Sequence, residues 1–256
     1  MENISEPTPI ADRSAMPSSG WGEGLRSPLT FGLVSCSGVG AFLFTATYLL
    51  EGITRPGYDA WQQPISALSL GPGGWVQQVN FVVFGVLTLL SAFGWYRLLR
   101  PGEASIMFPL FQILAGLGLI GAGFFSLDPF PGYPPGVVLT ASTVHGTIHT
   151  VCAWVIIISF AGGCFALAAH LGSKVRWHGW ALYSRLTGVL ILVFWGAFVQ
   201  GAYGTVAWLV PIAGLAERLS AGSHALWICL LVVTLFFQQR SQRKGMKLLN
   251  SANMSD

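Results

Sequence analysis

The feature that most constrains this chain is a series of apolar stretches, each long enough to cross a lipid bilayer as a helix. Such a helix needs about 20 mostly apolar residues to cross about 30 Å of hydrocarbon. The stretches that qualify are residues 29–50, 75–99, 107–127, 145–171, 183–203 and 212–237. Charged residues make up only 9% of the chain, against roughly 25% in an ordinary soluble domain. We therefore expect an all-α, polytopic membrane protein built as a bundle of six transmembrane helices.

The chain divides into three parts. Residues 1–28 contain acids, prolines and serines but no apolar run, which predicts a disordered cytoplasmic tail. They also lack the basic start and immediate apolar core of a secretory signal peptide. Residues 29–239 form the predicted six-helix transmembrane domain, and residues 240–256 a basic cytoplasmic tail.

The distribution of basic residues predicts the orientation. With six crossings, both tails and the loops 100–106 and 172–182 share one side of the membrane. That side and its helix ends hold Arg13, Arg26, Arg97, Arg100, Lys174, Arg176, Arg185, Arg240, Arg243, Lys244 and Lys247. The other side holds Arg55 and Arg218. Because loops rich in Lys and Arg stay in the cytoplasm, we expect a multi-pass protein of the plasma (inner) membrane with both termini cytoplasmic.

Small residues predict where helices approach one another closely. Gly32, Cys36 and Gly40 repeat every four positions in the first crossing. The third crossing contains Gly116, Gly118, Ala122 and Gly123. Small side chains let neighbouring backbones meet in a membrane, so these positions predict helix contacts.

Polar side chains gather on the predicted outer side. They are Glu51, Arg55, Asp59, Asn80, Asp128, His145, His149, Glu217, Arg218 and, deeper, His224. Ionisable groups in a membrane are costly unless paired or hydrated, so by default they mark a functional site. This one-sided cluster predicts an outward-facing polar cavity, and we take its members other than Arg55 as candidate ligand-binding residues.

Two pairs in this cluster have helical spacing. His145 and His149 are four residues apart at the start of the fourth crossing, so both rings should point from one face. Glu217 and His224 are seven apart in the sixth crossing and share a face. Arg218 is rotated about 100° from Glu217 and is expected to pair with an outer-loop acid or a lipid phosphate. Each pair also has a purely structural interpretation, as hydrogen-bonded histidines or as a helix-capping acid.

The outer loops are expected to be stiff. Residues 51–74 and 128–144 are rich in proline and carry aromatic residues. Such loops would form a lid over the cavity, or else an aromatic belt at the membrane surface.

Three runs carry a resemblance to a known family. They are RPGYDAWQQPISALSLGPGGWVQQVNF (55–81), FFSLDPFPGYPPG (124–136) and HGTIH (145–149). Together they resemble the bacterial six-helix membrane family known as domain of unknown function 998, over roughly residues 30 to 240. The resemblance implies the six-crossing topology and no particular reaction. It points to Asp59, Ser66, Asn80, Asp128, His145 and His149.

Two functional hypotheses from different classes follow. The first is binding of a membrane lipid, another hydrophobic small molecule or a membrane-protein partner in the outer cavity. The second is a zinc-dependent membrane hydrolase, in which His145, His149 and His224 with Asp128 or Glu217 hold the metal, and a remaining carboxylate acts as general base. It requires the imidazole nitrogens to come within about 2.0–2.1 Å of a common point.

Other functions have less support in the sequence. A proton-coupled transporter would need ionisable groups in the inner half of the bundle, which has almost none. Haem held by two histidines would need His224 opposite one of the other pair. The basic residues are spread over tails and helix ends, which argues against nucleic acid as a partner.

Overall fold

The bundle is built from six long helices. The computed structural model describes residues 25, 27–100, 104–138 and 141–253. The helices are α1 (Pro28–Thr54), α2 (Trp75–Leu98), α3 (Ala104–Phe124), α4 (Val144–Gly172), α5 (His178–Ala202) and α6 (Ala213–Asn253). Short 3₁₀ helices lie between them: η2 (Ile65–Ser69), η3 (Val175–Trp177) and η4 (Ala207–Ile212). Among the described residues, six helices are long and apolar enough to cross a membrane, which confirms the all-α, six-span prediction.

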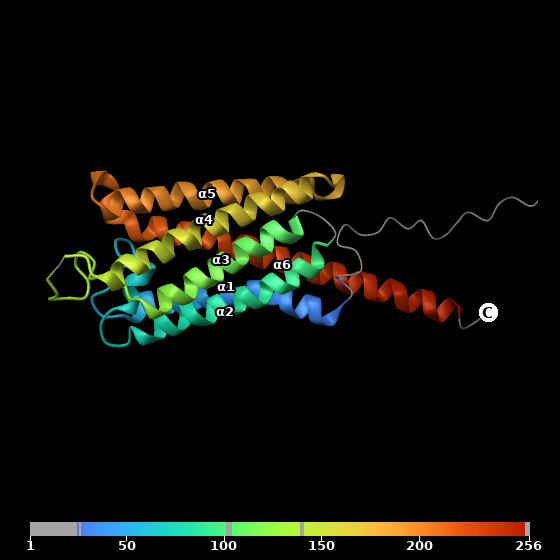
Figure 1. Cartoon of the computed structure of the whole chain (residues 1–256), viewed down its shortest axis with the longest axis horizontal. Helices are drawn as coiled ribbons and strands as arrows, with labels where there is room; N and C mark the ends of the chain where they lie inside the picture. Colours follow the sequence, from blue (N-terminus) through green and yellow to red (C-terminus); the bar gives the residue numbers. More distant parts are fainter. Residues whose placement is uncertain (1–24, 26, 101–103, 139–140, 254–256) are drawn as a thin grey trace, which may run out of the picture.

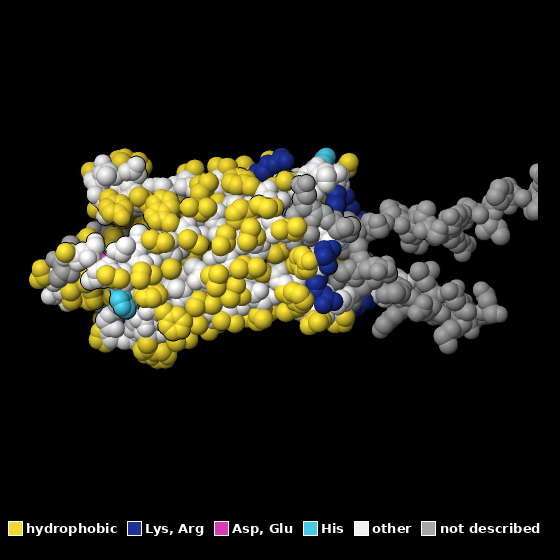
Figure 2. All heavy atoms as spheres, in the orientation of Figure 1, with side chains coloured by type: hydrophobic (Ala, Val, Ile, Leu, Met, Phe, Trp, Pro, Cys, Tyr) yellow, Lys and Arg dark blue, Asp and Glu magenta, His cyan; other side chains and the backbone are white. Residues whose placement is uncertain are grey.

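The helices run side by side (Figure 1), and the contacts between them close a ring. Each packs against its neighbours in the chain, and α6 closes the ring against α1. We call the two ends of the bundle the loop end and the basic end. The loop end carries the connections 55–74, 125–143 and 203–212. The described Lys and Arg side chains on the visible face gather at the opposite, basic end, as Figure 2 shows.

Aromatic side chains fill the interior of the basic half. The rings of Trp95 and Phe108 meet edge to face at 5.0 Å, and those of Phe108 and Trp227 at 6.2 Å. Trp227 Nε1 donates to Ser184 Oγ at 2.9 Å, so its buried N–H is satisfied. This half of the ring therefore has a solid core.

Glycines let α2 and α3 approach closely. A Cβ at Gly85 would lie 2.7 Å from the carbonyl oxygen of Gly116, and one at Gly123 would lie 2.8 Å from that of Gln78. The predicted role of Gly116 and Gly123 in helix contacts is confirmed. The prediction is wrong for Gly32, because a Cβ there would meet nothing within 4 Å.

Structure is described on the far side of both predicted boundaries, as a bundle contact at one end and as the single helix α6 at the other. Leu25 is fully buried, and its carbonyl accepts a hydrogen bond from Gln239 Nε2 at 2.9 Å. The bundle therefore begins before residue 29. At the other end α6 continues to Asn253, beyond the predicted boundary at 239. The predicted tail 1–28 lies outside the described residues except for its last few positions.

The glycine contacts give the first prediction. Gly85→Ala should lower the midpoint of thermal unfolding in detergent, because overpacking a helix contact costs about 1–3 kcal/mol. Gly32→Ala is the matched control and should leave the midpoint unchanged or raise it, since Ala favours helix over Gly. Equal midpoints for the two variants would contradict the close α2–α3 contact.

Candidate functional site

The loop after α1 turns back into the bundle. Its 3₁₀ helix η2 packs against α1, α2 and α6. Every residue of η2 is buried, and Ala67 and Leu68 have no exposed surface. Residues 63–69 are all buried, whereas the two flanks of the loop stay partly exposed. The loop 55–74 is therefore a plug, anchored in the loop end by its buried middle, rather than a detached lid, which refines the expectation for this loop.

Glu217 accepts a hydrogen bond from the first residue of η2. Pro64 precedes η2, and no side chain caps the helix from within the loop. Instead, the backbone N–H of Ile65 donates to Glu217 Oε2 at 2.5 Å. A carboxylate suits this position because it accepts the hydrogen bond of an otherwise unsatisfied N–H.

Arg218 holds the preceding part of the plug. Its Nη1 donates to the carbonyl oxygens of Gln63 and Gly214 at 3.0 and 2.9 Å, and its Nη2 to the hydroxyl of Tyr58. Tyr58 in turn donates to the carbonyl of Pro64 at 2.8 Å. Burial raises the pKa of the Tyr58 hydroxyl, against the opposing effect of Arg218, so Tyr58 remains a donor at neutral pH. Arg218 is thus an internal clamp, and its hydrogen-bond partners here are two carbonyls and a hydroxyl rather than the expected outer-loop acid.

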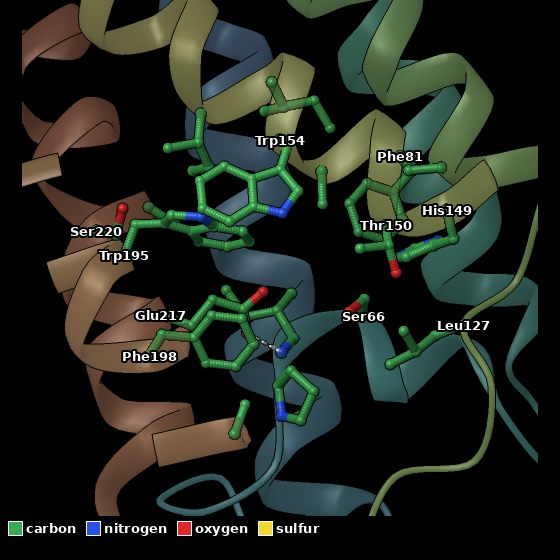
Figure 3. Close-up of a pocket in the computed structure, with 18 of the residues that line it drawn as sticks. Ser66, Phe81, Leu127, His149, Thr150, Trp154, Trp195, Phe198, Glu217 and Ser220 are labelled. Atoms are coloured by element: carbon green, nitrogen blue, oxygen red, sulfur yellow. Dashed lines mark hydrogen bonds between the residues drawn. The ribbon is translucent and has the colours of Figure 1, made fainter. Parts of the chain in front are cut away.

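Beside the plug lies a cavity of about 530 Å³, within the size range of small-molecule sites. Residues from α1 to α6, from η2 and from the loop after α3 line it. Its walls are mainly aromatic and aliphatic. The aromatic lining comprises Phe44, Phe81, Phe84, Phe130, Trp154, Phe160, Trp195, Phe198 and Tyr203. In Figure 3, Trp195, Phe198, Ser220 and Glu217 lie on one side of the cavity, and His149 and Thr150 on the other.

Four of the predicted ligand-binding residues line this cavity: Asp128, His149, Glu217 and His224. His149 is buried, and its Nδ1 lies 2.7 Å from the carbonyl oxygen of Phe125, to which it must donate. His224 is stacked on Phe160 with ring centres 3.6 Å apart. Glu217 keeps part of its surface accessible. Glu217 and His224, which are predicted to share one face of the sixth crossing, therefore both lie on the cavity wall.

Asp128 joins the loop after α3 to the start of α4. Its two carboxylate oxygens accept from the backbone N–H and the hydroxyl of Thr143, at 3.0 and 2.6 Å. Thr143 is the N-cap of α4 and accepts from the N–H of Gly146. A Cβ at Gly146 would lie 2.0 Å from Asp128 Oδ2, so only glycine allows this approach. Asp128 is thus a structural anchor at the cavity rim.

The other predicted site residues do not line the cavity. These are Glu51, Asp59, Asn80, His145 and Arg218. Asp59 Oδ1 accepts from the backbone N–H of Trp61 within its own loop. His145 is exposed and lies edge to face with Phe125 at 5.3 Å.

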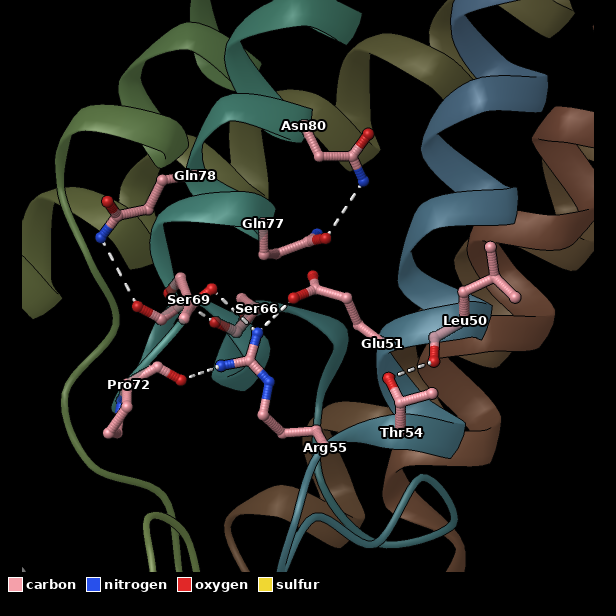
Figure 4. A network of polar contacts seen from close by, with 11 residues as sticks. Leu50, Glu51, Thr54, Arg55, Ser66, Ser69, Pro72, Gln77, Gln78 and Asn80 are labelled. Carbon is pink, nitrogen blue, oxygen red and sulfur yellow. Dashed lines mark hydrogen bonds and ion pairs between the residues drawn. The ribbon is translucent and has the colours of Figure 1, made fainter.

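Glu51 and Asn80 belong to a separate polar network between α1 and α2. Figure 4 shows Arg55 joined to Glu51 and to the carbonyl of Pro72, while Asn80 donates to Gln77 Oε1 at 3.1 Å. Arg55 thereby fixes the second half of the plug. Glu51 Oε2 and Gln77 Nε2 are buried and have no hydrogen-bond partner among the described residues. They are a complementary acceptor and donor, and in Figure 4 they face one another.

The structure does not assemble the predicted zinc ligands. Among the described residues, no three His, Cys, Asp or Glu side chains form a group able to hold one metal ion. His145 is exposed. His149 Nδ1 is hydrogen-bonded to the carbonyl oxygen of Phe125, and the His224 ring is stacked on Phe160. The shared point that the zinc-hydrolase hypothesis requires is therefore not provided by His145, His149, His224, Asp128 and Glu217.

The aromatic wall was not identified as part of the site from the sequence. Trp195 and Phe198 lie in the apolar fifth span, and Trp154 lies in the fourth. In such spans, aromatic residues are expected to face the lipid. The available signal was their helical spacing, since Trp195 and Phe198 are three residues apart and share a face. Their rings are 4.9 Å apart, and Trp154 meets Trp195 at 5.6 Å.

The fold and the site together define a six-helix multi-pass membrane protein with a cavity at one end of the bundle. Residues 38–234 match the family described as protein of unknown function, DUF998, and the chain belongs to this family. Comparison with curated proteins and with solved structures found no match.

The clamp gives the second prediction. Arg218→Met should increase the hydrogen-exchange rates of the amides in 58–66 about tenfold or more, because it removes charged hydrogen bonds worth about 1.5–3 kcal/mol each. Hydrogen-exchange mass spectrometry measures this. Arg100→Met is the control, since Arg100 lies over the Tyr96 ring at the basic end, 4.5 Å from its centre. Unchanged exchange in 58–66 would show that Arg218 does not hold the plug.

Proposed function

We propose that this protein binds a lipid or another hydrophobic ligand in the loop-end cavity. The observation that carries the proposal is the cavity itself, which combines about 530 Å³ of space, a mainly apolar lining and a few polar side chains. This composition is typical of sites for hydrophobic small molecules, where apolar walls supply affinity and polar groups fix orientation. For the alternative function as a zinc hydrolase, the part of the chain that the structure describes offers no group of three or more metal ligands.

The ligand enters from the bilayer between the loop-end halves of α4 and α5. Three cavity-lining residues at this boundary also keep large accessible surfaces: Val151 is 58% exposed, Trp154 42% and Tyr203 73%. The plug and its clamp cover a different part of the loop end. A side opening suits a ligand that is already dissolved in lipid.

The loop end faces away from the cytoplasm in this proposal. Lys and Arg gather at the basic end of the bundle (Figure 2), and such residues are retained on the cytoplasmic side. Both termini are then cytoplasmic, and the cavity opens in the outer half of the plasma (inner) membrane. A membrane-protein partner would meet the same side of the bundle.

Filling the cavity tests the proposal. Native mass spectrometry of the mildly extracted protein should show a retained lipid or hydrophobic molecule. Ala221→Phe should abolish this adduct, because Ala221 lines the cavity and a phenyl ring would occupy its space. Leu226→Phe, on the exposed side of α6, is the control and should keep the adduct. No adduct on the unaltered protein, or equal adducts on both variants, would overturn the proposal.

A further inference from the structure

Four polar side chains of the cavity present hydrogen-bond acceptors, beside the hydroxyls of Thr45, Ser66 and Ser142, which also line it. The hydroxyls of Thr147, Thr150 and Ser220 each donate their proton to a backbone carbonyl at 2.9 Å. His149 donates its Nδ1 proton to the carbonyl oxygen of Phe125, which leaves Nε2 of the neutral ring as an acceptor. What these groups can offer to a ligand is lone pairs.

The charged residues of the lining also favour a ligand that donates hydrogen bonds and carries positive charge. Asp128 and Glu217 line the cavity, and none of its described lining residues is Lys or Arg. Asp128 is engaged on both oxygens by Thr143. Glu217 uses Oε2 for the N–H of Ile65 and retains accessible surface. Arg218 lies close enough to act on the charge of Glu217, but it does not line the cavity and its guanidinium donates to Gln63, Gly214 and Tyr58. An anionic headgroup such as a phosphate would meet carboxylates in the cavity and no base on its wall.

The aromatic wall also favours a cation. Trp154, Trp195 and Phe198 form a continuous series of ring contacts on the cavity wall. The faces of such rings attract ammonium groups, most strongly when water is excluded. The Trp195 indole N–H, a donor in this wall, is enclosed in the protein and presents no surface to a ligand.

We infer that the ligand is a lipophilic primary amine, protonated at neutral pH, whose ammonium group pairs with Glu217 while its chain lies against the aromatic wall. This inference rests on the proposed function and names its ligand class. An alkylammonium supplies three donors to the acceptors of Thr147, Thr150, Ser220 and His149, and its charge is attracted to the Glu217 carboxylate. An alkyl alcohol supplies one donor and no charge, and an alkyl phosphate supplies the wrong charge.

The test uses three probes with the same chain: dodecylamine, dodecanol and dodecyl phosphate. Each is titrated into purified protein in dodecylmaltoside, with tryptophan fluorescence as the readout. The part of the signal that Ala221→Phe removes is the cavity-specific part. Dodecylamine should bind about tenfold more tightly than dodecanol and dodecyl phosphate. Glu217→Gln should remove that advantage and leave dodecanol affinity within about twofold.

A second variant guards against misfolding of Glu217→Gln, because Glu217 also accepts from Ile65. Ser220→Ala removes a lining hydroxyl on the same side of the cavity as Glu217 (Figure 3) and should weaken dodecylamine about threefold, leaving dodecanol unchanged. Equal cavity-specific binding of all three probes, or preference for dodecyl phosphate, would overturn the amine inference and keep the binding function. No cavity-specific binding of any probe would overturn both.

Discussion

The loop end of this bundle depends on the attachment of the plug to α6 by two consecutive residues. Glu217 accepts the first N–H of η2, while Arg218 reaches the carbonyl of Gln63 and the hydroxyl of Tyr58. Non-helical backbone can lie at membrane depth only where protein satisfies its polar groups. A buried η2 is therefore possible because a carboxylate and a guanidinium, about 100° apart on one helix, serve its donors and its carbonyls separately.

This attachment also explains why the two halves of the ring differ. In the basic half, Trp95, Phe108 and Trp227 pack against one another and leave a solid core. In the loop half, the plug occupies only the side between α1, α2 and α6. The remaining space inside the ring stays open as the cavity, which residues of all six helices line and which Trp154, Trp195 and Phe198 bound on the side of α4 and α5. The cavity is thus what remains when a polar plug, rather than a set of apolar side chains, closes the end of a helical ring.

The six spans could be predicted because lipid allows only helices for apolar runs of this length, and the second helix, predicted at 75–99, is Trp75–Leu98. The plug could not be predicted, since proline and glycine in 51–74 indicate a surface loop, and its burial arises from partners 152 residues away.

His145 and His149 show the limit of helical periodicity. Four residues rotate by about 400° and rise about 6 Å, so His145 clears the end of the bundle while His149 stays inside.

The one-sided cluster of polar residues therefore has two physical causes, which a sequence cannot separate. Arg218, Asp128 and the Glu51–Arg55 pair spend their hydrogen bonds on backbone and loop groups, so they shape the loop end. Glu217 shapes the loop end and also lines the cavity: one carboxylate oxygen accepts from the plug, and the side chain keeps accessible surface. Because a carboxylate has two oxygens, it can accept from Ile65 and from a bound donor together. A ligand that donated to Glu217, as proposed, would contact the residue that positions η2, and its binding would then be coupled to the fold of the plug.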